Sequence, residues 1–108
     1  MNNKKTVVLA TKSGNVDNAV IRIIKSKHGT NTRIRFVRSS RVFNTDSGFT
    51  TLIQQNRNTA TVYAIREELP RNSFETAVKT GLAFCILNKD ANKGWNIFHR
   101  RENNGLAQ

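Results

Sequence analysis

The apolar residues of this chain fall into short runs separated by clusters of turn-forming residues, and this spacing constrains the fold more than any other feature. Runs of about four to eight residues rich in Val, Ile and Thr are typical of strands. The Gly, Asn, Asp and Ser clusters between them favour tight turns. Short connections favour antiparallel neighbours, because a parallel pair needs a crossover of about a dozen residues or more. We therefore expect a mostly antiparallel sheet arranged as a meander.

The predicted strands begin near the N-terminus and continue through two thirds of the chain. Residues 49–54 are ambiguous, because their β-branched residues fit a fourth strand, while Asp46 or Ser47 could cap a short helix there. A final strand is expected after the turn at 92–94. The other expected strands cover residues 6–11, 20–25, 31–43 and 59–66, and the final one covers 95–100.

The apolar period changes after Pro70. Seven residues then follow the spacing of one helix face, which predicts one main amphipathic helix over residues 72–87. Asn72 is the expected N-cap, and Glu75 could complete a capping box. The expected fold class is α+β, with this helix packed on one face of the mostly antiparallel sheet. The seven residues are Phe74, Ala77, Val78, Gly81, Leu82, Cys85 and Ile86.

The chain length of 108 residues is typical of a single domain covering 1–108, and we expect the polar tail at 102–108 to be frayed. No secretory segment or membrane-length apolar run is present, so a cytoplasmic protein, intact from its start and without a membrane partner, is expected. The single cysteine excludes an internal disulfide. Cys85 lies on the apolar stripe of the expected helix and is predicted to be a buried, inert thiol.

Charge is distributed unevenly along the chain. The net charge is +11, from 18 Lys and Arg against seven Asp and Glu, and residues 1–45 contain only one acidic residue, Asp17. No acidic residue stands between Asp17 and Asp46. Such a concentration of positive charge attracts polyanions. The basic residues of that interval are Arg22, Lys25, Lys27, Arg33, Arg35, Arg38 and Arg41.

Within residues 31–43, Ile34 and Phe36 alternate with Arg33 and Arg35 at the period of a strand. We expect the helix to cover the apolar face and the arginines to point out from the open face of the sheet. Arginine suits phosphate because its planar fork binds two phosphate oxygens at once. The sequence therefore predicts binding to the phosphate backbone of nucleic acid through those seven basic residues, with little sequence specificity.

The type of nucleic acid is predicted from the aromatic residues. Tyr63, Phe43 and Trp95 are interpreted as half-buried strand residues rather than stacking platforms, which slightly favours duplex DNA over RNA. No helix-turn-helix, zinc finger or RNP-like motif supports the recognition of specific bases. The phenylalanines assigned to the core are Phe36, Phe74, Phe84 and Phe98.

Three other interpretations fit the same charge. The basic face could bind an acidic protein, such as a nucleic-acid-processing enzyme that the chain inhibits or recruits. It could also be a solvated surface that keeps the protein dispersed. Exposed strand edges could support a homodimer that extends the basic face.

The catalytic alternative is a small metal-free ribonuclease. Its general acid and base would be His28 and His99, each beside basic residues, with Glu67 or Glu68 as another possible base. No phosphate-binding loop, dinucleotide fingerprint or zinc-ligand spacing is present, so we expect neither a cofactor nor a metal. A protein without enzymatic activity is the favoured prediction.

Overall fold

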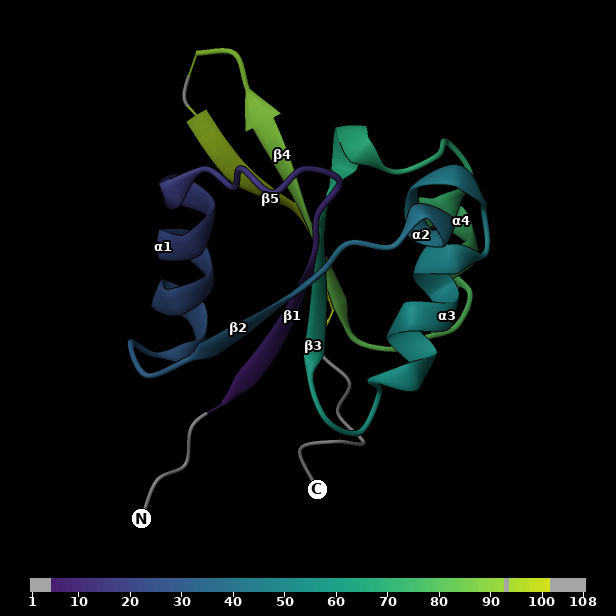
Figure 1. Ribbon diagram of the computed structural model, residues 1–108, viewed down its shortest axis with the longest axis horizontal. Coiled ribbons are helices and arrows are strands. Elements are labelled where there is room, and N and C mark those ends of the chain that lie inside the picture. Colours follow the sequence, from purple (N-terminus) through teal and green to yellow (C-terminus); the bar gives the residue numbers. More distant parts are fainter. Residues whose placement is uncertain (1–4, 93, 102–108) are drawn as a thin grey trace.

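The computed structural model describes residues 5–92 and 94–101, which build a five-stranded sheet with helices on both faces (Figure 1). The strand order is β2-β1-β3-β4-β5. The first four strands are parallel to their neighbours, and only β5 is antiparallel, to β4. In chain order the elements are β1 (Thr6–Ala10), α1 (Asn18–His28), β2 (Arg33–Val37), α2 (Ser40–Asn44), α3 (Gly48–Gln55), β3 (Thr61–Ile65), the 3₁₀ turn η1 (Arg66–Glu68), α4 (Ser73–Val78), β4 (Phe84–Asp90) and β5 (Gly94–Arg101).

The mixture of helices and one sheet is confirmed, but the mostly antiparallel meander is wrong. The error begins at residues 20–25, which lie in α1 rather than in a strand. Val20 and Ile24, one helical turn apart, face the sheet and are fully buried, so packing overrides the β-propensity of this run. Asp17 caps the helix by accepting the Ala19 N–H at 2.8 Å. Because α1 is a crossover, β1 and β2 pair in parallel.

The expected strand over 31–43 is also only partly right. Its first half is β2, and its second half turns into α2. Residues 49–54 lie in α3, so the helical alternative is the correct one, with Ser47 at the N-cap position but without a side-chain cap bond. The expected strands at 6–11, 59–66 and 95–100 correspond to β1, β3 and β5.

The predicted helix over 72–87 is wrong beyond its first half. α4 ends at Val78, Gly81 turns the chain with φ +72°, and β4 follows. A central strand covered on both faces is apolar at consecutive positions, so it can match a helical pattern by chance. Asn72 does occupy the N-cap, but its side chain donates to Asp46 Oδ2 at 3.4 Å instead of capping the helix.

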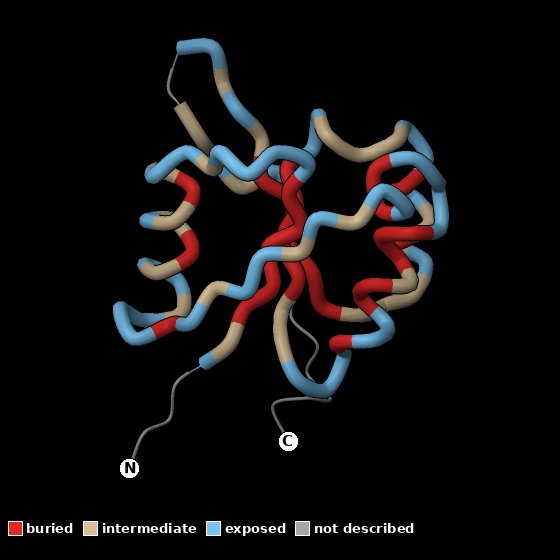
Figure 2. The backbone as a smooth tube through the Cα atoms, in the orientation of Figure 1, coloured by how far each residue is buried: buried red, intermediate tan, exposed pale blue. Residues whose placement is uncertain are grey.

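The core consists of two layers, one on each face of the sheet (Figure 2). On one face, α1 packs against alternate residues of the central strands, including Leu9, Tyr63 and Cys85. On the other face, α2, α3 and α4 cover the remaining residues, including Phe84. The expected open face of the sheet is therefore absent from the described part of the chain. The buried thiol is confirmed, since Cys85 is only 2% exposed, although it lies in β4.

Among the described residues, no helix is long and apolar enough to cross a membrane. The tail at 102–108, for which fraying is expected, lies outside the described residues.

Candidate nucleic-acid interface

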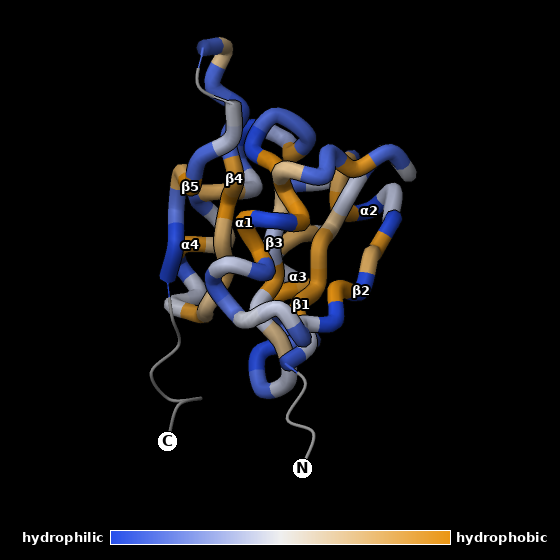
Figure 3. The backbone as a smooth tube through the Cα atoms, turned by 90° about the vertical axis from the view of Figure 1, so that its left-hand side faces the viewer, coloured by the Kyte–Doolittle hydropathy of each residue, from blue (hydrophilic) through white to orange (hydrophobic). Residues whose placement is uncertain are grey.

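Two of the predicted arginines, Arg33 and Arg35, lie on β2, which is an edge strand of the sheet. Ile34 pairs with Val7 and faces α1, whereas Arg35 pairs with Val8 and faces the α3 side. The alternation predicted from the sequence is thus correct. The arginines are exposed because no further strand lies beyond β2, and not because a face of the sheet is bare. In Figure 3, hydrophilic and hydrophobic segments alternate along β2 at the side of the molecule.

The Arg35 side chain is held in place by the end of α3. Its guanidinium donates to Asn56 Oδ1 at 3.1 Å. Asn56 is 7% exposed, and its own Nδ2 donates to the Leu52 carbonyl at 2.9 Å, which fixes the orientation of the amide. Arg57, the next residue, is exposed. The turn after α3 therefore adds a cation beside β2 that the sequence alone did not assign to this surface.

Two of the predicted lysines lie at the end of α1, shortly before β2 begins. Lys25 and Lys27 lie in the last turn of α1, where positive charge complements the helix dipole. Only residues 29–32 separate this helix from β2, and the turn is closed by Thr32 bonds to the Gly29 carbonyl. The end of α1 therefore lies close to the start of β2, although Lys25 and Lys27, two residues apart, point to different sides of the helix.

Arg38 and Arg41 continue the series past the carboxyl end of β2. A Cβ placed on Gly14 would lie 3.7 Å from Arg38 Nη1, so this guanidinium borders the loop after β1. The same loop donates the Lys12 N–H to Glu68 Oε1 at 3.1 Å. From β1 the chain continues to β2 on one side and then to β3 on the other side of β1, and open parallel sheets bind ligands at such a switch point, at the carboxyl ends of the strands.

We use the name basic edge for the predicted cations on β2 and on the segments that flank it, together with Arg57. Within residues 5–92 and 94–101, no carboxylate comes within 4 Å of its cationic groups to form an ion pair. The unneutralised charge makes this surface a strong attractor of polyanions. The basic edge consists of Lys25, Lys27, Arg33, Arg35, Arg38, Arg41 and Arg57.

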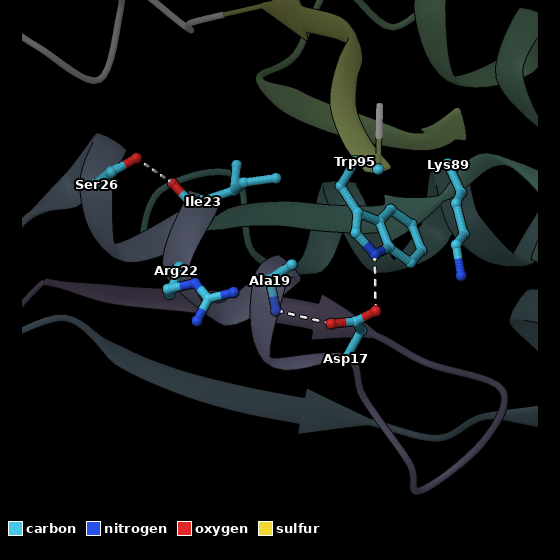
Figure 4. Close-up of a pocket in the computed structure, with 8 residues that line it drawn as sticks. Asp17, Ala19, Arg22, Ile23, Ser26, Lys89 and Trp95 are labelled. Carbon is cyan, nitrogen blue, oxygen red and sulfur yellow. Dashed lines mark hydrogen bonds between the residues drawn. The ribbon is translucent and has the colours of Figure 1, made fainter. Parts of the chain in front are cut away.

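Arg22 does not join the basic edge, because it lies on the side of α1 that faces the β4–β5 hairpin. There it borders an open hollow of about 540 Å³ (Figure 4). Trp95 forms one wall, and its indole N–H donates to Asp17 Oδ2 at 3.1 Å. Lys89 Nζ lies 5.8 Å from the centre of the Trp95 ring. Of the seven predicted basic residues, Arg22 is thus the one that lines this hollow.

Asp17 remains ionised at neutral pH. Its pKa lies below the ordinary value mainly because it accepts the Ala19 N–H, and next because it accepts the Trp95 indole N–H. The charges of Lys89 and Arg22 lower the pKa further. The hollow therefore contains two cations and one anion.

The two histidines lie on opposite faces of the sheet and cannot act as one acid–base pair. His28 Nε2 lies 2.8 Å from the hydroxyl of Tyr63, which belongs to the core layer under α1. His99 stacks on Phe84, in the other layer, with ring centres 4.5 Å apart. Burial lowers the pKa of His99, and the nearby Arg101 charge adds to this effect. In the part of the chain that the structure describes, no cluster of three or more His, Cys, Asp and Glu could hold a metal.

Two of the phenylalanines assigned to the core are exposed instead. Phe36 on β2 is 50% exposed and Phe98 on β5 is 41% exposed, whereas Phe84 is fully buried as expected. The Arg66 guanidinium lies over the Phe98 ring at 3.8 Å, beside a second hollow of about 360 Å³. Tyr63, by contrast, is fully buried. Aromatic surface beside cations is more abundant than the sequence indicated.

No protein-family model, curated protein or solved structure matches the chain.

Proposed function

We propose that the protein binds nucleic acid through contacts between the basic edge and phosphate groups, without recognising a particular sequence. The observation that carries this proposal is the row of exposed cations along β2 and its neighbours, which no described carboxylate neutralises. Most of the affinity of non-specific nucleic-acid binding comes from such contacts, through the release of counterions.

The geometry of β2 supports the proposal. Arg33 and Arg35 are two residues apart on one strand, and this spacing corresponds to about 6.6 Å. Successive phosphates of one DNA strand are about 3.4 Å apart along the helix axis. The two side chains therefore start far enough apart to contact separate phosphates of one strand. Arg35 is already oriented by Asn56, so less side-chain freedom is lost on binding.

The preference for duplex DNA is weaker than the sequence suggested. It depended on a scarcity of exposed aromatic residues, but Phe36 is half exposed between Arg35 and Arg38. An exposed ring among arginines is typical of surfaces that bind single strands by stacking. The proposal therefore covers both duplex and single-stranded nucleic acid.

The test is the double variant Arg33→Ala with Arg35→Ala. Its binding to labelled duplex DNA, single-stranded DNA and RNA would be measured by fluorescence anisotropy at about 50 and 200 mM salt. We expect weaker binding to every sequence and a slope of log affinity against log salt that is smaller by about one to two, because each phosphate contact contributes about 0.9.

The matched control is Arg71→Ala with Lys79→Ala, which removes the same charge from the α4 side of the molecule. We expect the control to lose much less affinity. Equal losses in the two variants would show that net charge, and not the basic edge, determines binding. If the wild type binds none of the three nucleic acids at low salt, the proposal is wrong, and an acidic protein becomes the partner to seek.

A further inference from the structure

We infer that the hollow between α1 and the β4–β5 hairpin is a subsite for an unpaired base of single-stranded nucleic acid, which stacks on Trp95 while its phosphate meets Arg22 and Lys89 (Figure 4). This inference rests on the proposed function and adds to it a site separate from the basic edge.

The indole of Trp95 is oriented before any ligand arrives. Its N–H is bonded to Asp17 Oδ2, and the other oxygen of this carboxylate accepts the Ala19 N–H at the start of α1. The ring is thus anchored to the helix across the hollow. Because its orientation is set by this bond, a stacking partner would restrict the side chain little further.

Space for a flat ligand is present beside the ring. Lys89 lies on one side of the indole, while Arg22 and Ile23 lie on the other (Figure 4). Gly94 also borders the hollow, and a Cβ placed there would meet no atom within 4 Å. The hollow is therefore open beside Gly94, and Ile23 and Trp95 give it apolar surface that suits the face of a base.

The charges of the hollow match a nucleotide better than a simple anion. Arg22 and Lys89 are exposed cations that can contact a phosphate. Asp17 would repel a ligand that carries only negative charge, but its carboxylate can also accept an N–H from the edge of a base. A nucleotide can satisfy both the cations and the carboxylate, because its phosphate can contact Arg22 and Lys89 while its base donates to Asp17.

The subsite requires a base that is free of its neighbours. Within a duplex both faces of a base are covered by the adjacent pairs, so an indole can stack only on a base that has been unstacked. Single strands present such bases without the cost of opening a duplex. We therefore expect the hollow to favour single strands, whereas the basic edge accepts either form.

The chain contains one tryptophan, so its intrinsic fluorescence reports directly on the hollow. In the wild-type protein, titration with a single-stranded oligonucleotide should quench this fluorescence to saturation. A duplex of the same sequence should bind with little quenching. A nucleoside monophosphate is the third ligand, because it offers the same base and phosphate without a strand.

The matching variants are Trp95→Ala and Trp95→Phe, with binding measured through a label on the oligonucleotide. Loss of one stacked base corresponds to roughly fivefold to a hundredfold weaker binding, and we expect this for Trp95→Ala with single strands only. Trp95→Phe retains a stacking ring and should remain close to the wild type. Circular dichroism would verify that both variants are folded, and the wild-type titration gives an answer even if Trp95→Ala is not.

The outcomes separate this inference from the proposed function. If single strands bind but neither quench Trp95 nor depend on it, the subsite is wrong while phosphate binding by the basic edge stands. If the monophosphate quenches as strongly as the oligonucleotide at equal concentration, the hollow binds free nucleotides and the role in strand binding is wrong. If no nucleic acid binds, both fail together.

Discussion

His99 shows how one residue of β5 acquires an unusual environment. In the pairing of β4 with β5, Ile86 faces His99 and Leu87 faces Ile97, so Phe98 is the extra residue of a β-bulge. The rings of Phe98 and His99 both contact Phe74 as a result. The His99 Nε2 atom is buried there and has no hydrogen-bond partner among the described residues.

This environment leads to a prediction about pH. Burial lowers the pKa of His99 in the folded protein from the ordinary value of 6.5, so the unfolded chain takes up the proton first on acidification. The contribution of His99 to the free energy of unfolding should therefore be fully present above about pH 6.5. It should decrease as the pH falls from there toward the pKa of His99 in the folded protein. Urea unfolding at about pH 5.5 and 7.5 would measure the change.

His99→Phe is the informative variant, since it retains a ring against Phe84 but cannot titrate. We expect it to lose part of the pH dependence seen in the wild type. An NMR titration that places the pKa of His99 at or above 6.5 would contradict the explanation.

At the scale of elements, the packing of α2 against α3 depends on the missing side chain of Gly48. A Cβ on this residue would lie 2.2 Å from the Arg41 carbonyl oxygen and 2.8 Å from Val42 Cα, which are backbone atoms that cannot rotate away. We therefore predict that Gly48→Ala lowers the free energy of unfolding by about 1–3 kcal/mol or more, as overpacking does. Chemical denaturation would measure this loss.

Gly14→Ala is the control, because its Cβ would meet only the end of the Arg38 side chain, at 3.7 Å. Its φ is not positive, so alanine fits the backbone there. We expect a change within about 0.5 kcal/mol. Equal effects at Gly14 and Gly48 would mean that the contact with α2 is not the cause.

The elements also show where sequence patterns are reliable. β1 and β3 are bounded by turn residues and could be predicted. α1 could not, because its Val and Ile content indicates a strand and its helical face contains only Val20 and Ile24 as fully buried residues. β4 was mistaken for a helix because Phe84 to Leu87 are all buried, so no alternation is visible. Once α1 is misassigned, parallel pairing can no longer be inferred.

At the scale of the whole molecule, the excess of positive charge in the first half of the chain could be predicted from the sequence. The way in which the fold distributes this charge over different parts of the surface could not be predicted. The acid-free interval between Asp17 and Asp46 predicts a basic surface of some kind. Only the fold shows that Arg22 lines a hollow beside the β4–β5 hairpin, and that the turn at Asn56, which is followed by Arg57, lies beside Arg35. The exposure of Phe36 could not be predicted either, because it depends on β2 being an edge strand. An edge strand and a central strand can have the same sequence pattern, and they differ only in the number of strands beside them.

The net charge of +11 leads to a prediction for the free protein. Like charges on the basic edge repel one another, and added salt shortens the Debye length from about 30 Å at 0.01 M to about 8 Å at 0.15 M. We therefore expect the Tm to rise over this range of sodium chloride, and to rise less in the Arg33→Ala, Arg35→Ala variant. Differential scanning calorimetry would test this, and a Tm that falls with salt would contradict it.

The position of β2 at the margin of the sheet has a consequence for encounters between copies of the protein. An edge strand offers unpaired N–H and C=O groups to any passing strand, and charged side chains are a common protection against such pairing. In this protein the protection against strand pairing comes from the positive charge of the arginines on β2. It is therefore lost when that charge is neutralised by a bound anion. A polyanion that neutralised them would at the same time remove the barrier to a second copy aligning along the same strand. Several copies of the protein gathered on one such polyanion would then be expected to self-associate, whereas the protein in free solution would resist this.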